Sequence, residues 1–270
     1  MAFTPLIPAA PLHPYVRMLW DWRVAASDFR LERILPQPGS GLILNLLEDE
    51  TRVYDDDQGL SCERSSGAVY SGQFTRSFVI DSREQIAVMG VMLHPAGAGA
   101  FLREPMDRLG NRHVALDDLI GGASAPLRER LLEASDARAR LAVLAHWLSR
   151  RFVPPTLHPA VRHALAAFAR SPSIDRIAPL IADSGLSARR FGALFSEQVG
   201  IGAKQYARLR RFRRVVDPVQ QGERIEWAQV AADCGFHDQP HLVREFHAFS
   251  GMTPGAYARR RGEHANHVSL

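Results

Sequence analysis

The chain has 270 residues, of which 46% are apolar and 23% charged, enough to build the cores of one large domain or two ordinary ones. No apolar run is long enough to cross a bilayer, and Cys62 and Cys234 form no metal-ligand pattern, so we expect neither a membrane-spanning helix nor a cysteine-built metal site. Because no secretion signal opens the sequence, we expect a reduced, cytoplasmic protein.

The formal net charge of +4 is unevenly distributed. Residues 1–155 carry 17 arginines against 19 acidic residues, whereas residues 156–270 carry 15 arginines and Lys204 against 10. A basic C-terminal part on a slightly acidic N-terminal part is typical of a polyanion-binding module joined to something else. Ordinary surface charge would give the same balance, so charge alone leaves nucleic-acid binding open.

Short strands are predicted for the first third of the chain, after an extended, proline-rich lead-in at residues 1–14. Aromatic or apolar runs bounded by Asp, Gly, Ser and Gln clusters occur at residues 15–23, 41–47, 51–54, 68–71, 74–80 and 87–93. Several short strands at this spacing predict a small β-barrel or sandwich.

From Pro95 onward the apolar pattern becomes helical, with helices predicted at residues 96–103, 126–133 and 135–151. The apolar stripe of the last helix can form a dimer seam or pack on the strands of its own chain. Residues 152–159 contain three prolines and are interpreted as a linker, so we place a domain boundary there.

The N-terminal part offers no recognisable catalytic or metal-binding constellation. It has no Gly-x-Ser-x-Gly, no Gly-x-Gly-x-x-Gly after a strand, no Walker loop and no His-Glu-x-x-His. His94, at the end of an apolar run, is interpreted as a structural residue, with a pocket-lining or metal-binding role as the alternative. We therefore expect no enzyme activity, no cofactor and no metal.

The C-terminal part contains an internal repeat, residues 174–206 and 225–257, each of which reads as a helix, a glycine turn and a second helix. The matched pairs are Gly185 and Gly235, Ser187 and Asp238, Phe191 and Leu242, Phe195 and Phe246, Gly200 and Gly251, and Tyr206 and Tyr257, with one extra residue, His237, in the second copy. Two short helices joined by a glycine turn, the second with an N-cap, form the helix-turn-helix plan for placing a helix in a DNA major groove. The sequence therefore predicts two such units in tandem.

An arginine-rich helix is predicted between the two units, at residues 203–216. Tyr206, Leu209 and Phe212 repeat every third residue as a buried stripe, and arginines occupy the other faces. Because no acid precedes Asp217 in this helix, phosphate contact is favoured over a merely solvated surface. The phosphate candidates here are Arg210, Arg211 and Arg214.

Residues from about 160 to 260 resemble the DNA-binding domain of AraC/XylS-type transcriptional regulators. The motifs that carry the resemblance are Gly185-Leu186-Ser187, Gly235-Phe236-His237-Asp238-Gln239 and Gly251-Met252-Thr253-Pro254. The resemblance implies seven helices, with two recognition helices that enter successive major grooves on one face of double-stranded DNA. The expected fold class is thus α+β: an N-terminal β-barrel-like domain with helices, then an all-α seven-helix domain.

The resemblance also assigns the residues that face the bases. In the first recognition helix these are Arg189, Gly192 and Ala193, and in the second they are Gln239, Pro240, Val243 and Arg244. Arg244 suits guanine, Gln239 suits adenine, and Val243 and Pro240 suit a thymine methyl group, with a salt bridge to a neighbouring acid as the alternative for Arg244. The remaining phosphate candidates are Ser187, Arg190, His237, Asp238 and His241.

The first unit departs from the family pattern. Gly192 and Ala193 provide little side chain for reading bases, and Pro179 is predicted to kink the supporting helix. Ile181 stands where the second copy has Ala231, which predicts looser or shifted packing. We therefore predict that the second unit dominates base discrimination, while the first contributes phosphate contacts and shape.

The N-terminal part resembles, more weakly, the sensor region of a subset of these regulators, through residues 33–36 (Arg-Ile-Leu-Pro) and 90–97 (Gly-Val-Met-Leu-His-Pro-Ala-Gly). This implies a cupin-like barrel that binds an effector or dimerises. The expected domains are a sensor or dimerisation domain at 1–153, the DNA-binding domain at 154–262 and a flexible tail at 263–270.

The predicted function is a sequence-specific DNA-binding transcriptional regulator that responds to a small-molecule effector or to dimerisation. The expected partners are double-stranded DNA, a small-molecule effector, RNA polymerase and a second copy of the chain, with no membrane. Two alternatives stay open: a ligand-binding or enzymatic barrel with a DNA-targeting appendage, and a nucleoid-like DNA protein of low specificity.

Overall fold

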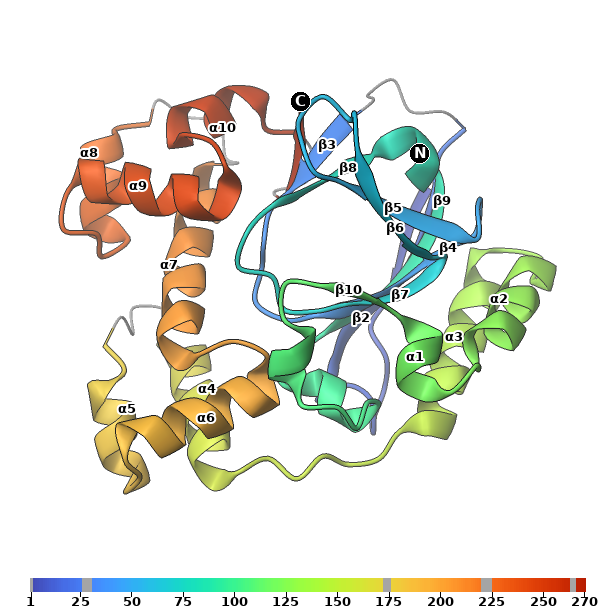
Figure 1. The fold of residues 1–270 in the computed structure, drawn as a ribbon, viewed down its shortest axis with the longest axis horizontal. Helices are drawn as coiled ribbons and strands as arrows, with labels where there is room; N and C mark the ends of the chain where they lie inside the picture. The colour runs from blue at the N-terminus through green and yellow to red at the C-terminus, as the bar shows by residue number, and fades with distance from the viewer. Residues whose placement is uncertain (1, 26–30, 172–175, 220–224, 263–265) are drawn as a thin grey trace.

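Two antiparallel sheets lie between two groups of helices in the computed structural model, which describes residues 2–25, 31–171, 176–219, 225–262 and 266–270 (Figure 1). One sheet has six strands in the order β1-β2-β9-β4-β7-β10, and the other has five in the order β11-β3-β8-β5-β6. The strands are β1 (Ala2–Leu6), β2 (Val16–Arg23), β3 (Leu31–Ile34), β4 (Gly41–Asn45), β5 (Glu50–Tyr54), β6 (Cys62–Ser66), β7 (Ala68–Ser71), β8 (Phe78–Asp81), β9 (Ala87–Leu93), β10 (His113–Ala115) and β11 (His267–Ser269).

The outer face of the six-stranded sheet packs against three helices. These are α1 (Leu116–Ile120), α2 (Ser124–Glu133) and α3 (Ala137–Arg151). Because side chains alternate along a strand, Leu19 and Asp21 of β2 point to this face. Asp21 is 2% exposed and accepts from Nε of Arg140 in α3 at 2.6 Å. The apolar stripe of α3 is therefore used within the chain, which favours the second of the two roles considered for it.

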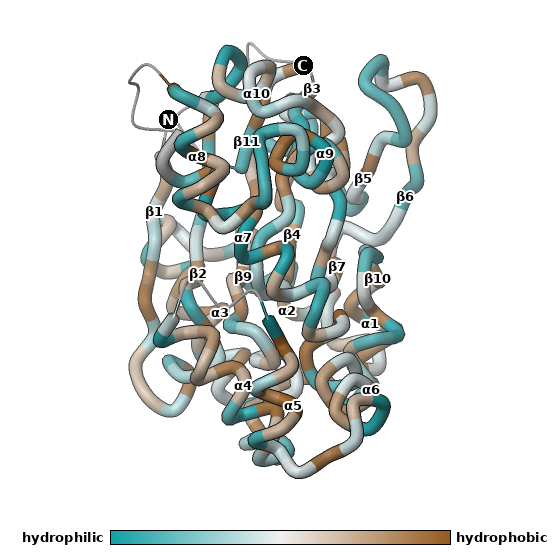
Figure 2. The backbone as a smooth tube through the Cα atoms, turned by 90° about the vertical axis from the view of Figure 1, so that its left-hand side faces the viewer, coloured by the Kyte–Doolittle hydropathy of each residue, from teal (hydrophilic) through white to brown (hydrophobic). Residues whose placement is uncertain are grey.

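Among the described residues, seven helices make up the part of the chain that lies beside the sheets. They are α4 (Pro159–Arg170), α5 (Ala178–Ser184), α6 (Ala188–Val199), α7 (Ala203–Val219), α8 (Trp227–Asp233), α9 (Gln239–Ser250) and α10 (Pro254–Arg260). Figure 2 shows α4–α6 and α8–α10 at opposite ends of this part, with α7 between them. One apolar cluster runs through all seven, and Phe212 of α7 stacks on Phe249 of α9 at 5.1 Å.

The predicted fold class is confirmed, with a barrel that stays open as two separate sheets. The six predicted strands are present, whereas β1, β3, β6, β10 and β11 lie where no strand was predicted. The helix predicted at residues 96–103 is wrong: a single 3-10 turn, η2 (Gly97–Ala100), replaces it. Its start is set by Ala96, whose φ of 63° is incompatible with an α-helix.

The tail also differs from the prediction. We expected residues 263–270 to be flexible; of these, residues 263–265 lie outside the described residues. Residues 267–269 form β11, which pairs antiparallel with β3 in the register Val268 to Arg33. Val268 is fully buried, and it belongs to the same apolar cluster as the helices α4–α10. It therefore packs between the sheet and the helical part. Among the described residues, no helix has the length and apolar character needed to span a bilayer.

Candidate nucleic-acid interface

The first helix-turn-helix unit consists of α5, a glycine turn and α6. Gly185 follows α5 with φ of 66°, a left-handed conformation that glycine adopts without strain. Ser187 caps α6, because its Oγ accepts a hydrogen bond from the backbone N–H of Arg190 at 3.2 Å. Phe191 and Phe195 then turn inward and are buried, so the opposite side of α6 faces outward.

The second unit repeats this construction with α8 and α9. Gly235 has φ of 78°, and the Oδ1 of Asp238 accepts from the backbone N–H of His241 at 2.7 Å. That hydrogen bond, with His237 beside the carboxylate, lowers the pKa of Asp238. Leu242 and Phe246 are buried in the positions that Phe191 and Phe195 occupy in α6.

Pro179 does not kink the first supporting helix, and that prediction is wrong. The helix begins at Ala178, so Pro179 lies in its first turn. Backbone N–H groups in the first turn have no partner within the helix, so the missing donor of a proline costs nothing there. Ile181 is half-buried, whereas its counterpart Ala231 is 1% exposed, so packing in the first unit differs from that in the second.

The structure places all seven predicted base-facing residues on accessible parts of α6 and α9. Five are exposed and two, Gly192 and Val243, are half-exposed; the exposed ones are Arg189, Ala193, Gln239, Pro240 and Arg244. No ion pair holds Arg244 within the described part of the chain. Its neighbour Glu245 is bound by Arg208 of α7 at 2.7 Å, and this contact lowers the pKa of the Glu245 carboxyl. Arg244 is thereby left available for DNA, and its role stays a prediction.

Three phosphate candidates of α7 fasten this helix to α4 and to the second unit. Arg210 lies over the ring of Phe168 at 5.4 Å and donates to the carbonyl oxygen of Ser171. Arg211 donates to the carbonyl oxygen of Gly235, and Arg214 donates to that of Asp233. Their guanidinium groups thus already hold the turn of the second unit and the end of α4, a structural role that the sequence did not indicate.

The other phosphate candidates lie at the starts of the recognition helices. Ser187, Arg190, His237 and Asp238 are exposed, and His241 is half-buried. Asp238 carries a negative charge, and its carboxylate caps α9. This residue therefore fixes where α9 begins. His237 lies next to Asp238, with its Nδ1 3.1 Å from the Oδ2 of that carboxylate.

A groove of about 350 Å³ between α7 and α9 contains residues that the sequence prediction missed. Its lining residues are Lys204, Ala207, Arg208, Arg211, His241 and Glu245. Lys204 is exposed and is the sole lysine of the chain. It lies in the first turn of α7, where a basic residue beside the arginine run was a signal that sequence reasoning could have used.

The inner face of the six-stranded sheet is apolar and belongs to neither of the two main cores. Trp20 and Trp22 alternate with Leu19 and Asp21 and so point away from α3, and the ring of Trp20 lies over Gly90 of β9. Ile43 pairs with Gly90 on the same row. These two tryptophans and Ile43 are half-buried, so this face remains partly accessible.

His113 lies at the edge of this inner face, on β10. Its ring contacts Phe74 at 4.9 Å and Phe78 at 4.8 Å, and neither ring nitrogen has a hydrogen-bond partner among the described residues. Burial alone lowers the pKa of His113 to about 4, so the imidazole is neutral at physiological pH. An unpartnered buried imidazole is a polar group that the sequence reading did not single out.

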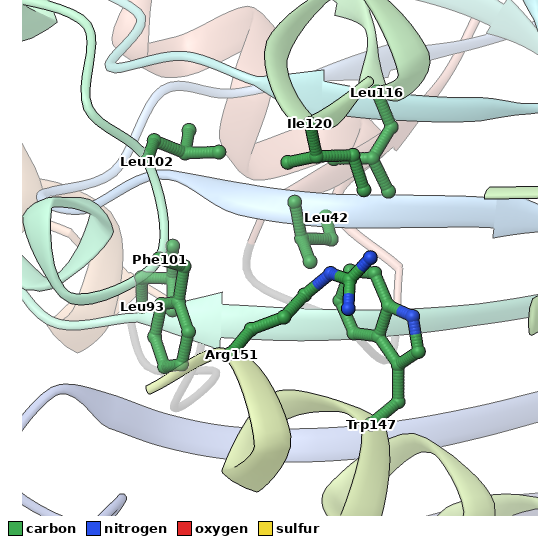
Figure 3. Close-up of a pocket in the computed structure, with 8 residues that line it drawn as sticks. All are labelled: Leu42, Leu93, Phe101, Leu102, Leu116, Ile120, Trp147 and Arg151. Carbon is green, nitrogen blue, oxygen red and sulfur yellow. The ribbon is translucent and has the colours of Figure 1, made fainter. Parts of the chain in front are cut away.

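A second apolar site lies on the outer face, between the sheet and α1 and α3 (Figure 3). Aliphatic and aromatic side chains surround it, and Arg151 lies over the ring of Trp147 at 4.5 Å. The cavity volume is about 10 Å³, room for about one water molecule. It is a packing gap that cannot hold an organic ligand without movement of its walls.

Comparisons with known proteins match both parts of the chain. A helix-turn-helix domain model matches residues 180–260, and a model described as a domain of unknown function (DUF6597) matches residues 4–115. No curated protein sequence matches.

Among solved structures, similarity extends over nearly the whole chain at low sequence identity. Unsaturated fatty acid-bound ToxT from Vibrio cholerae strain SCE256 is 11% identical, with a TM-score of 0.46 over 95% of this chain and 94% of that one. ToxT from Vibrio cholerae O395 bound to a methylnaphthalenyl butenoic acid is 9% identical, with a TM-score of 0.47 over 96% of this chain and 99% of that one.

Proposed function

We propose that this chain is a DNA-binding transcriptional regulator of the AraC type, which reads two successive major grooves with α6 and α9; the helix-turn-helix match over residues 180–260 supports this. The observation that carries the proposal is the shared construction of the two units: each has a left-handed glycine turn, a capped recognition helix and an accessible outer side. Grooves on one face of B-DNA repeat every helical turn, about 34 Å, which is the spacing that a tandem pair has to match. The proposal includes no enzyme activity, and the helix-turn-helix match supports a regulator.

Base discrimination is assigned mainly to α9. Gln239 and Arg244 are long, exposed and able to form two hydrogen bonds with one base edge, whereas Gly192 and Ala193 of α6 can form none. Arg189 is left as the long side chain on the reading side of α6. The first unit would therefore contribute phosphate contacts and DNA shape.

Binding-site selection from a random DNA library tests this proposal with the full chain. We expect a site with two elements about 10 base pairs apart, with the stronger base preference in the element that loses specificity in the Arg244→Ala variant. The matched control is Arg259→Ala, which removes an exposed arginine from α10 and should leave the selected sequence unchanged. A selection without base preference would favour the nucleoid-like alternative, and a stronger preference in the element facing Arg189 would contradict the assignment to α9.

We further propose that a small apolar effector binds the inner face of the six-stranded sheet. Trp20, Trp22 and Ile43 give this face large, partly accessible apolar side chains, and His113 adds a neutral polar group at its edge. Apolar surfaces with a few polar groups are the usual composition of small-molecule sites. The cavity at Arg151 is a weaker candidate because of its small volume.

Fluorescence distinguishes the two positions, because the chain has four tryptophans and they report different places. With the apolar dye ANS as the probe, energy transfer from Trp20 and Trp22 should dominate, so Trp20→Phe with Trp22→Phe should remove most of it. Trp147→Phe is the matched control for the outer cavity. Loss of transfer in Trp147→Phe alone would move the site to the cavity in Figure 3.

A homodimer, contact with RNA polymerase and a cytoplasmic location complete the proposal. The apolar side of α3 is buried on its own sheet, so a dimer would use another surface. Sedimentation of the full chain over a range of concentrations, with and without operator DNA, measures the dimer directly.

A further inference from the structure

The N-terminal domain contacts the ends of both recognition helices, at equivalent positions of the repeat. Gly200 ends α6 with φ of 96°, and Gly251 ends α9 with φ of 72°. A Cβ at Gly200 would lie 3.2 Å from the Cβ of Gln73 and 3.3 Å from the carbonyl oxygen of Met106. A Cβ at Gly251 would lie 2.7 Å from Nη1 of Arg33. The turn at Gly200 is thus buried against N-terminal residues, whereas Gly251 is exposed and has the guanidinium end of Arg33 beside it.

A single segment of the N-terminal domain, residues 72–77 between β7 and β8, reaches both turns. Gln73 lies against Gly200 near one end of the segment. At the other end, the backbone N–H of Ser77 donates to the carbonyl oxygen of Phe249, two residues before Gly251, at 2.8 Å. Four residues of extended chain span at most about 14 Å, so this segment limits how far apart the two helix ends can lie.

The segment is itself held firmly in the N-terminal domain. Gln73 is 2% exposed and donates to the carbonyl oxygen of Gln37 at 2.8 Å. The ring of Phe74 packs on Phe78 at 4.8 Å. The backbone N–H of Thr75 donates to the Oδ1 of Asn111 at 2.7 Å. A segment with this many fixed side chains can act as a rigid spacer.

Strand β11 closes the contact from the C-terminal side. It continues the chain beyond α10 and adds to the edge of the five-stranded sheet next to β3. The backbone N–H of Leu35 donates to the carbonyl oxygen of Asn266 at 2.8 Å, and that of Leu270 donates to Leu31 at 3.1 Å. Val268 and Leu35 are buried in the same apolar cluster as the helices of the DNA-binding part. The end of the chain is thereby fastened to the sheet that carries Arg33.

We propose that segment 72–77 and strand β11 form a spacing clamp, which sets the distance between the two DNA elements that this chain accepts. The proposal rests on the proposed reading of two successive grooves. In the clamped arrangement the base-facing residues of α6 and α9 remain accessible, so the clamp constrains the two helices without covering them. Arg33, Gln73, Ser77 and Val268 are then positioning residues that determine spacing without touching DNA.

The experiment measures binding of the full chain to DNA duplexes in which the distance between the two selected elements is varied by one and two base pairs. Wild type should bind the selected spacing about tenfold or more tightly than the altered ones, because two linked modules gain affinity only when their geometry allows both to bind. Val268→Asp places a charge in the clamp contact, and Arg33→Ala removes the side chain beside Gly251. In both variants the preference should fall to within about threefold, with the base preferences of each element unchanged.

Two controls separate spacing from general damage. Val268→Ile keeps an apolar β-branched residue at this position, so this variant should have the same spacing profile as wild type. Arg64→Ala removes an arginine of the same sheet that is 63% exposed and should have no effect. Hydrogen exchange at the amide of Leu35, which is bonded to Asn266, reports whether β11 has been released in Val268→Asp.

An unchanged spacing profile in Arg33→Ala, or in Val268→Asp with β11 released, would overturn the clamp while leaving the regulator intact. If wild type selects a single element with no second one, the two-groove proposal fails first, and the clamp fails with it. Arg33→Ala removes the side chain that donates to the Oγ of Ser77 at 3.0 Å and places no charge in the apolar cluster, so the spacing test remains decisive if Val268→Asp fails to fold.

Discussion

The two helix-turn-helix units of this protein share one framework but differ in what they present to DNA. Both have a left-handed glycine before the recognition helix, a side-chain cap at its start and buried aromatic residues along its inner side. On the outer side, Val243 and Arg244 of α9 stand where α6 carries Gly192 and Ala193, and α9 has the long, exposed Gln239 at its start. The residues that build a unit and the residues proposed to read DNA are thus separate sets, and the two units differ in the second set while they share the first.

The first prediction is that both units contribute equally to stability, and it is tested by replacing one buried phenylalanine in each. Phe195→Ala and Phe246→Ala should each reduce the free energy of unfolding by about 3–5 kcal/mol, because each leaves a cavity in a tightly packed core. Since one apolar cluster runs through both units, either variant should weaken binding at both DNA elements. Urea unfolding followed by circular dichroism measures the change, with the exposed His247→Ala as control. Loss of binding at one element only would show that the units are energetically independent.

The second prediction is that α9 contributes more to base discrimination than α6, and it is tested by replacing one arginine in each helix. Arg244→Ala should cost about 1–3 kcal/mol of binding free energy at the preferred base pair and relax specificity there. Arg189→Ala should weaken binding by less and about equally for all sequences, as expected for a phosphate contact. Titration of operator variants by fluorescence anisotropy compares the two. Relaxed specificity in Arg189→Ala with little in Arg244→Ala would reverse our assignment.

The two helix caps should respond differently to acid. The pKa of Asp238 is lowered from its usual 3.8, mainly by the hydrogen bond from the N–H of His241. The stability that this carboxylate contributes is therefore fully present above pH 3.8 and is lost as pH falls through the lowered pKa. Ser187 has no charge to lose. The difference in unfolding free energy between wild type and Asp238→Asn should shrink below pH 4, whereas that of Ser187→Ala, about 1 kcal/mol, should not change with pH.

The measurement is urea unfolding at a series of pH values between 3 and 7, with each variant compared with wild type at the same pH. Parallel curves for Asp238→Asn and wild type over the whole range would mean that this cap contributes nothing through its charge.

The smallest expected effect concerns the groove between α7 and α9. If a DNA phosphate passes there, Lys204→Ala should reduce the slope of log affinity against log salt by about one, and weaken binding equally for all sequences. Glu245→Gln is the matched opposite change, because it removes a negative charge from the same groove. Equal salt slopes for wild type and Lys204→Ala would place the backbone of the DNA elsewhere.

Local sequence patterns predicted the frame of the DNA-binding part closely. Gly185 and Gly235 marked the turns, Ser187 and Asp238 marked the starts of α6 and α9, and the aromatic periodicity marked the buried side. Each of these signals acts within a few residues, through backbone conformation, capping or helical spacing. The misplacement of a kink at Pro179 came from one such local uncertainty, the residue at which α5 begins.

Contacts between distant segments were beyond this kind of reading. The sequence did not indicate that three arginines of α7 donate hydrogen bonds to distant carbonyl oxygens, because those partners are 19 or more residues away. The three are Arg210, Arg211 and Arg214. The sequence predicts a flexible tail where β11 lies, because three residues have no strand signal of their own until β3 provides a partner edge. The burial of His113 also depends on residues distant in the sequence, because the aromatic rings of Phe74 and Phe78 pack against its imidazole.

The sequence by itself therefore determined what each unit is: a helix, a glycine turn and a second helix with a side-chain cap, with longer polar side chains on the outer side of α9 than at the matching positions of α6. The tertiary structure alone decided how the units are held, through the arginines of α7, the shared apolar cluster, segment 72–77 and β11. The physical reason is the distance along the chain over which each interaction acts. Caps, turns and apolar periodicity are properties of neighbouring residues, whereas the spacing of two helices depends on surfaces that meet only once the whole chain has folded.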